Sequence, residues 1–171
     1  VQSLPAENPP KPSERLKALE LLIGHTWDAI VEKADWREGG GDSVHIESTF
    51  EWIPYIDAIY VRTLALRGNG EPTHILDTYI YHHTGTGRLR CLALSNWAGR
   101  SGVYEGDLTV LEGGALQLDL QGYEGERDVW QVVRFDFEQD GSLHHRVWSV
   151  DGTDRKLMLD VHHEKLVPKK D

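Results

Sequence analysis

The sequence predicts an all-β protein, an antiparallel up-and-down barrel of ten strands with a short N-terminal helix. Apolar and polar residues alternate with a period of two over most of the chain after Gly24. Turn dipeptides such as Asn-Gly and Asp-Gly separate the alternating runs. Almost every link is short, and a meander of this length closes on itself because closure removes its exposed edges.

Length and composition indicate one domain. The chain has 171 residues, of which 39% are hydrophobic, and a chain of about 150 residues already buries about 70% of its unfolded surface. Asp and Glu outnumber Lys and Arg by 28 to 18, a net charge of −10, which argues against a nucleic-acid partner. No apolar run approaches the roughly 20 residues of a membrane helix. We therefore expect no nucleic acid, no membrane span, and a monomer or homodimer.

The first segment, 1–12, is predicted to be a flexible arm because it contains four of the seven prolines and no periodic apolar pattern. The barrel domain then spans 13–168. The sequence starts at Val1 without a Met, which fits a removed leader and an extracytoplasmic location or a shortened cytoplasmic chain equally well.

A short helix is expected next. Ser13 suits its N-cap, Glu14 suits its positive end, and Gly24 supplies its left-handed stop. The apolar residues recur at helical spacing, at Leu16, Leu19, Leu22 and Ile23.

Ten strands follow the helix. Their expected ranges are 26–34, 43–53, 57–67, 72–83, 88–97, 101–111, 115–122, 127–139, 142–150 and 155–165. A barrel of eight to ten strands can enclose one small ligand.

Polar residues inside otherwise apolar strands are candidates for catalysis. If the face of 72–83 that carries Asp77, Tyr79 and Tyr81 looks inward, a carboxylate and two phenols share the cavity, with Arg62 on the neighbouring strand. A buried carboxylate has a raised pKa and acts as a base, and phenols donate to an oxyanion. Asp160 is a second candidate base. The alternative is an outward ladder in which Asp77 pairs with Arg62.

Aromatic residues in the strands suggest a cavity wall for a hydrophobic or planar ligand, although core packing explains them equally well. The candidate ligand-binding residues are Trp27, Trp52, Tyr60, Trp97, Arg146, Trp148 and His162.

Six of the nine histidines form adjacent pairs, namely His82-His83, His144-His145 and His162-His163. On a strand only one of each pair faces inward. In a meander all three pairs, with His25, fall at one end of the barrel, where imidazoles can bind a transition metal. The alternative is a set of half-exposed rim residues, because 72–83 lies across the barrel from the last two strands. The single cysteine, Cys91, lies in an apolar run and is expected to be buried and unreactive.

Two segments resemble a known family. Gly24-His25-Thr26-Trp27 is similar to the Gly-x-Trp start of lipocalin-like barrels, with one extra residue. The runs 102–108 and 116–122, with Tyr104-Glu105-Gly106 and Gly122, resemble the Tyr-Glu-Gly and Leu-x-Leu-x-x-x-Gly pattern of an uncharacterised bacterial lipocalin-like (calycin-type) family. The resemblance covers about residues 16–166 and implies a ten-stranded barrel with an internal cavity, but no established activity.

Nitrobindin is a neighbouring family with a barrel of the same size, which binds haem through a histidine on its last strand. This resemblance places Asp160 where that histidine stands, and His162 two residues further on. Aspartate is a poor haem ligand, so we expect no cofactor, whereas a two-residue shift would restore a ligand.

These observations favour a small-molecule binding protein that holds a hydrophobic or aromatic ligand in a barrel cavity. One alternative is a cofactor-independent isomerase, dehydratase or lyase that uses the Asp/Tyr/Arg set. A second alternative is haem or metal binding through rim histidines. An inward Asp beside an inward Tyr would favour the enzyme, whereas an apolar interior would favour the carrier.

Overall fold

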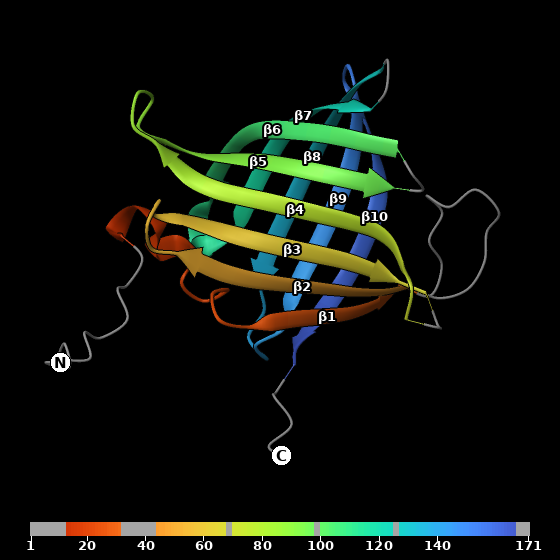
Figure 1. Cartoon of the computed structure of the whole chain (residues 1–171), viewed down its shortest axis with the longest axis horizontal. Helices are drawn as coiled ribbons and strands as arrows, with labels where there is room; N and C mark the ends of the chain where they lie inside the picture. The colour runs from red at the N-terminus through yellow and green to blue at the C-terminus, as the bar shows by residue number, and fades with distance from the viewer. Residues whose placement is uncertain (1–12, 32–43, 68–69, 98–99, 125–126, 167–171) are drawn as a thin grey trace, which may run out of the picture.

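A computed structural model describes residues 13–31, 44–67, 70–97, 100–124 and 127–166. Within these residues ten antiparallel strands form a closed barrel in which each strand pairs with its sequence neighbours (Figure 1). The elements are η1 (Glu14–Leu19), β1 (Thr26–Val31), β2 (Val44–Ile53), β3 (Ala58–Leu66), β4 (Pro72–His83), β5 (Arg88–Trp97), β6 (Arg100–Val110), η2 (Glu112–Gly114), β7 (Leu116–Glu124), β8 (Arg127–Phe137), β9 (Leu143–Asp151) and β10 (Asp154–Lys165). The predicted fold class is confirmed. The predicted arm, 1–12, lies outside the described residues.

The predicted strand boundaries agree with the structure to within two residues wherever the chain is described. Gly141 and Gly152 have φ angles of 86° and 58° in the turns before β9 and β10. These are the Asp-Gly positions that the sequence marked as tight turns, and positive φ there favours glycine. The predicted end of the first strand, 32–34, lies outside the described residues.

Strands β1 and β10 close the barrel. Trp27 and Asp28 of β1 pair with Lys165 and Glu164 of β10, whereas β1 forms six residue pairs with β2. The amide of Leu166 adds a hydrogen bond of 2.9 Å to the carbonyl oxygen of Thr26. The first and last strands therefore share the sheet and leave no free edge between them.

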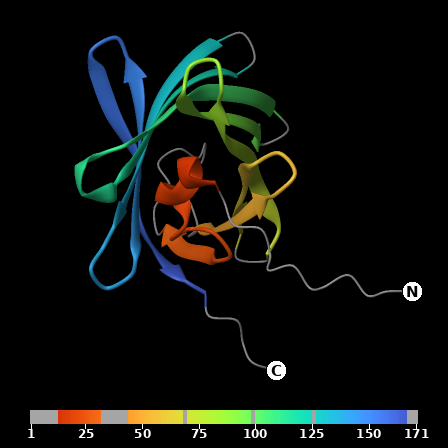
Figure 2. The ribbon, with the colours of Figure 1, turned by 90° about the vertical axis from the view of Figure 1, so that its left-hand side faces the viewer.

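The N-terminal segment plugs one end of the barrel. Figure 2 looks at that end and shows η1 lying across the ring of strands. η1 is a 3-10 helix, and its residues Leu16 and Leu19 are 0% exposed, followed by Leu22 at 1%. Leu16 and Leu19, three residues apart, lie on one side of this helix of three residues per turn, and Leu22 follows in the turn after it.

Ser13 occupies the predicted N-cap position of η1, but its side chain makes no capping hydrogen bond. Its backbone amide instead donates to Asp57 Oδ1 at 3.2 Å, which ties η1 to the turn between β2 and β3. Gly24 has the expected positive φ, 76°, but it does not stop the helix, because η1 already ends at Leu19 with Glu20 as its C-cap.

Burial assigns one face of each strand to the interior. Val61 of β3 pairs with Thr78 of β4, Ile59 pairs with Ile80, and all four are buried. Inside the wall between β6 and β7, a Cβ atom on Gly122 would lie 2.3 Å from the ring of Tyr104. The glycine of the family-like run therefore makes room for an inward tyrosine. No helix among the described residues is long and apolar enough to span a membrane.

Candidate functional site

The barrel interior has two different parts. The plugged half, beneath η1, is lined by large apolar side chains of one core cluster, including Trp27, Phe50, Ile59, Ile80, Leu108, Leu116, Leu118 and Leu143. Trp52, Phe135 and Phe137 pack against this cluster and are partly buried. Large side chains beneath a helical plug fill this half as a packed core.

Toward the other end of β2–β6 several inward-facing residues are small, although the buried Val44 and Ile46 of β2 belong to a second core cluster there. This small-residue wall is made of neighbouring inward-facing residues, namely Ser48, Thr63, Ala65, Thr78, Ala93, Ser95 and Gly102. Ser48 pairs with Thr63, Thr78 with Ala93 and Ser95 with Gly102, and the larger Leu76 lies between Thr63 and Ser95. Thr63 and Leu76, with Gln131 of β8 across the barrel, face inward but are only half-buried. Solvent-accessible surface therefore extends into this part of the interior.

The polar groups of the small-residue wall are uncharged. Ser48 Oγ and Thr63 Oγ1 lie 2.9 Å apart and form a hydrogen bond. The buried polar side chains among the described residues are Ser48, Thr78, Ser95 and His163, and none of the buried side chains there is Asp, Glu, Lys or Arg. Burying an unpaired charge is costly, so this interior suits a neutral molecule.

The residues proposed for catalysis on β3 and β4 lie on the outside of the barrel. Asp77, Tyr79 and Tyr81 alternate with the buried Thr78 and Ile80, so the opposite face of β4 looks inward. Of the two arrangements that the sequence left open, the structure therefore has the one in which this set does not face the barrel interior. The reason is that alternate residues of a strand face opposite sides of the sheet, so Asp77, Tyr79 and Tyr81 all face outward together.

Asp77 belongs to an outer ladder with β3. Tyr60 donates a hydrogen bond to Asp77 Oδ1 at 2.5 Å, and Arg62 Nε donates to the same oxygen at 3.0 Å. The hydrogen bond from Tyr60, together with Arg62, lowers the pKa of Asp77 even though partial burial raises it. A carboxylate with a lowered pKa is a weaker base than the one expected from burial in a cavity. The pairing of Asp77 with Arg62 is the alternative that the sequence left open.

The predicted aromatic lining divides between the two faces. Trp27 and Trp52 lie in the core of the plugged half. Tyr60 faces outward beside Tyr79, with ring centroids 5.3 Å apart, and Trp148 lies outside beneath the Arg146 guanidinium, 5.6 Å from its ring centroid. Trp97 pairs with Arg100 in the backbone register, and its side chain lies outside the described part.

The two inward histidines of β9 and β10 form a pair in which His163 is buried and His145 is half-buried at its surface. His145 Nδ1 and His163 Nε2 lie 3.1 Å apart, and Phe135 stacks on His145 with a centroid distance of 4.5 Å. Loss of hydration, then the neighbouring imidazole of His163, lowers the pKa of His145 well below its usual value. Burial likewise lowers the pKa of His163 to about 4. Both rings are therefore neutral at pH 7.

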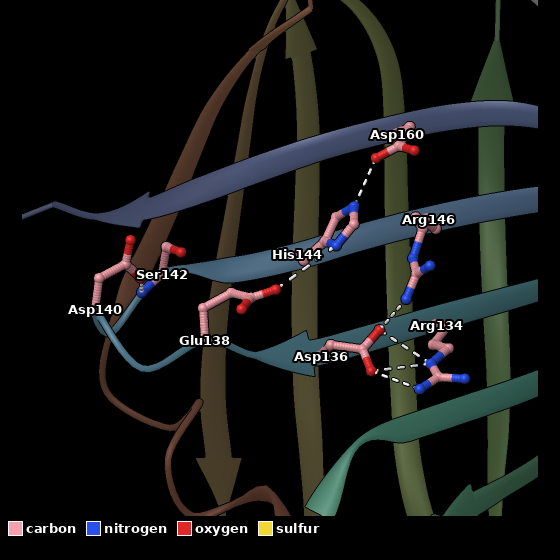
Figure 3. Close-up of polar contacts among 8 residues, drawn as sticks. All are labelled: Arg134, Asp136, Glu138, Asp140, Ser142, His144, Arg146 and Asp160. Carbon is pink, nitrogen blue, oxygen red and sulfur yellow. Dashed lines mark hydrogen bonds and ion pairs between the residues drawn. The ribbon is translucent and has the colours of Figure 1, made fainter.

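The outward face of β8 and β9 carries an Arg–Asp–Arg cluster, drawn in Figure 3. Arg134 donates to both oxygens of Asp136, and Arg146 Nη2 donates to Asp136 Oδ2 at 2.5 Å. Burial opposes ionisation of Asp136, but the hydrogen bonds from the two guanidinium groups outweigh it and lower its pKa. Arg146 is thus held on the outer surface rather than in the barrel interior.

Beside this cluster, His144 lies between two carboxylates (Figure 3). His144 Nε2 is 2.6 Å from Asp160 Oδ1, and its Nδ1 is 3.7 Å from Glu138 Oε1. The exposed His162 stacks on His144 with a centroid distance of 4.2 Å. An open hollow of about 360 Å³ adjoins these residues and is lined by Glu138, Gln139, Asp140, Ser142 and His162.

Asp160 and His162 both face outward, so neither presents a haem ligand to the interior. This corrects the expectation that a two-residue shift would place His162 there, because such a shift preserves the face. The grouping with Glu138 was missed from the sequence. The sequence feature that could have indicated this grouping is the alternation of three charged residues on one face of β8 and its extension, namely Arg134, Asp136 and Glu138.

The remaining rim histidines do not join this group. His82 Nδ1 lies 3.3 Å from Arg15 of η1, and His83 interacts with Thr86 in its own turn. Cys91 is buried as predicted, and burial raises the pKa of its thiol to about 12.

Comparison of the sequence with protein-family models and with curated proteins gives no match. The closed ten-stranded barrel is compatible with the lipocalin-like resemblance of the sequence. The chemistry of the two sides of the sheet is therefore the basis for a functional conclusion.

Proposed function

We propose that this protein binds an uncharged hydrophobic or aromatic small molecule inside the barrel, against the small-residue wall. The observation that carries the proposal is the wall of small side chains over β2–β6, which lies between the large apolar side chains of the plugged half and the second core cluster around Val44 and Ile46. Small side chains occupy less of the lumen than leucine and aromatic residues. A barrel of ten strands has a wider lumen than one of eight, whose side chains just fill it.

The polarity of the interior supports a carrier rather than an enzyme. The Asp77 carboxylate and its Tyr60 and Arg62 partners lie on the outer surface, away from the proposed ligand. Ser48, Thr63, Thr78 and Ser95 offer hydroxyl groups, which orient a neutral ligand without a net charge. The ligand class is therefore apolar with a small number of hydroxyl, carbonyl or ether groups.

The test uses N-phenyl-1-naphthylamine, a neutral aromatic probe whose fluorescence rises in an apolar site. We expect saturable binding to the wild type. Thr63→Phe extends a bulky ring from the wall into the lumen and should weaken binding by about tenfold or more, equivalent to about 1.4 kcal/mol. Thr63→Val keeps the volume and should retain binding within about threefold. Far-UV circular dichroism and the thermal midpoint verify that each variant is folded.

A surface control separates the interior from the exposed apolar residues. Trp130 is 52% exposed on the outer face of β8, so Trp130→Ala should leave probe binding unchanged. Loss of binding in Trp130→Ala, with retention in Thr63→Phe, would show that the probe sits on the outer surface and would overturn the proposal. Absence of saturable binding to the wild type would overturn the proposal that the interior binds a neutral aromatic molecule.

A further inference from the structure

On the outer surface of β9 and β10, two imidazoles and a carboxylate lie close together. His144 of β9 and His162 of β10 are directly opposite each other in the register, and Glu138 follows the end of β8. One ligand atom from each of these three side chains lies within 4.8 Å of the others. Directly opposite residues on antiparallel strands have Cβ atoms about 5 Å apart, so the sheet itself holds the two histidines together.

Asp160 orients His144 for metal binding. Asp160 Oδ1 accepts a hydrogen bond from the Nε2–H group of His144, with the two atoms 2.6 Å apart. A neutral imidazole that donates from Nε2 carries its lone pair on Nδ1, and that atom is the one nearer to Glu138. A histidine that ligates a metal with one nitrogen usually donates the other N–H to a carboxylate, and the Asp160–His144 pair has this arrangement.

The separation of His144 Nδ1 from Glu138 Oε1 also fits a bridging ion. At 3.7 Å it is too long for a hydrogen bond. Two ligands at about 2.1 Å from one tetrahedral zinc ion lie about 3.4 Å apart. A small side-chain adjustment therefore brings both atoms into the coordination range.

His162 supplies the third ligand. Its ring now stacks on His144, with an angle of 16° between the planes, and its side chain is exposed. An exposed imidazole changes its ring orientation at small cost, so rotation can direct a nitrogen at the ion. Three protein ligands leave a further coordination position for water, beside the hollow that Glu138 and His162 line.

We propose that Glu138, His144 and His162 form a surface site for a zinc-type divalent transition metal ion, with Asp160 orienting His144. Imidazole nitrogen and carboxylate oxygen together favour Zn²⁺, Co²⁺, Ni²⁺ or Cu²⁺ over Mg²⁺ and Ca²⁺, which prefer all-oxygen sites. The site lies on the outer face of the sheet and is independent of the ligand proposed for the interior.

A second cluster on the same barrel is a natural control. His45 of β2 contacts Asp28 through Nε2, and its Nδ1 lies 3.8 Å from Glu47 Oε1. The arrangement repeats the carboxylate–imidazole–carboxylate order but has one imidazole in place of two. If the second imidazole is decisive, the site at His144 binds Zn²⁺ much more tightly than the cluster at His45.

The experiment titrates untagged protein with Zn²⁺ by calorimetry and with Co²⁺ by visible absorption. We expect about one tight equivalent of Zn²⁺ per chain, and no displacement by a large excess of Mg²⁺. His144→Ala or His162→Ala should remove this equivalent, and Asp160→Asn should weaken it by about 10–100-fold. His45→Ala should leave it unchanged. The Co²⁺ spectrum should show a nitrogen-containing coordination sphere that changes in His162→Ala.

Three results would overturn the proposal. The first is the absence of a tight equivalent in the wild-type protein, and the second is unchanged Zn²⁺ binding in both His144→Ala and His162→Ala. The third is loss of the tight equivalent in His45→Ala. Because His162 is exposed, its variant keeps the test meaningful if His144→Ala affects folding, and circular dichroism checks both proteins.

Discussion

Strands β9 and β10 together carry one pair of histidines on the inner face of the sheet and one pair on the outer face. Each inner histidine is the next residue in the sequence after an outer one, yet the two pairs have different surroundings. His145 and His163 lie inside the plugged half, against Phe135, and burial lowers their pKa values. His144 and His162 lie outside, among the carboxylates of Glu138 and Asp160. The same two strands therefore carry a neutral pair of imidazoles on the inner face and, on the outer face, a pair of imidazoles that lies among carboxylates. Strand parity, rather than residue type, decides which chemistry an imidazole can perform.

The largest expected difference between the two faces is in how much a truncated side chain lowers the free energy of unfolding. Leu143 pairs with His163 on the inner face and is 1% exposed. Leu143→Ala should lower the free energy of unfolding by about 2–5 kcal/mol, because it leaves a cavity in a closed core. Gln139→Ala, at an exposed position of the turn before β9, should change it by less than about 0.5 kcal/mol. Urea denaturation measures both, and equal effects would contradict the assignment of the inner face.

The inner pair should also make stability depend on pH. The usual pKa of histidine is about 6.5 in an unfolded chain, whereas burial lowers the pKa of His163 to about 4 in the folded protein. Between these values the unfolded chain binds more protons, so the free energy of unfolding falls as the pH drops from about 6.5 toward 4. At about 1.4 kcal/mol per pH unit, the loss for His163 is on the order of 3 kcal/mol.

Urea denaturation at several pH values tests this dependence. His163→Leu should show a shallower loss of stability between about pH 6.5 and 4 than the wild type, because it removes one buried imidazole that must gain a proton. An unchanged slope would mean that His163 is already protonated or already hydrated in the folded state.

The smallest effect is expected on the outer face of β3 and β4. Asp77→Asn removes the charge that Arg62 and Tyr60 contact, and an exposed pair of this kind contributes about 0–1 kcal/mol. The thermal midpoint should therefore shift by only a few degrees at most, and binding of N-phenyl-1-naphthylamine should remain as in the wild type. A loss of probe binding in Asp77→Asn would connect this outer ladder to the interior site and would restore Asp77 as a functional residue.

Much of the fold could be predicted from local patterns. Period-two alternation, Asp-Gly turns such as Asp140-Gly141, and short links were sufficient for strand boundaries and for closure. The helix type was harder, because leucines three apart fit both an α-helical stripe and the 3-10 turn that Leu16 and Leu19 form. The candidate site was predicted least well. Asp77, Tyr79 and Tyr81 share a face with one another as expected, but that face is the outer one.

The sequence by itself determined the number of strands, their order and which residues share a face, since these depend on neighbours along the chain. Only the tertiary structure decided which face is inside. In β4 the face with Leu76, Thr78 and Ile80 and the face with Asp77, Tyr79 and Tyr81 are both partly apolar, so burial of a single strand does not distinguish them. The choice is made when all ten strands pair in one register, because a one-residue slip would reverse every side chain of a strand. That register also places His144 opposite His162, and Glu138 beside them.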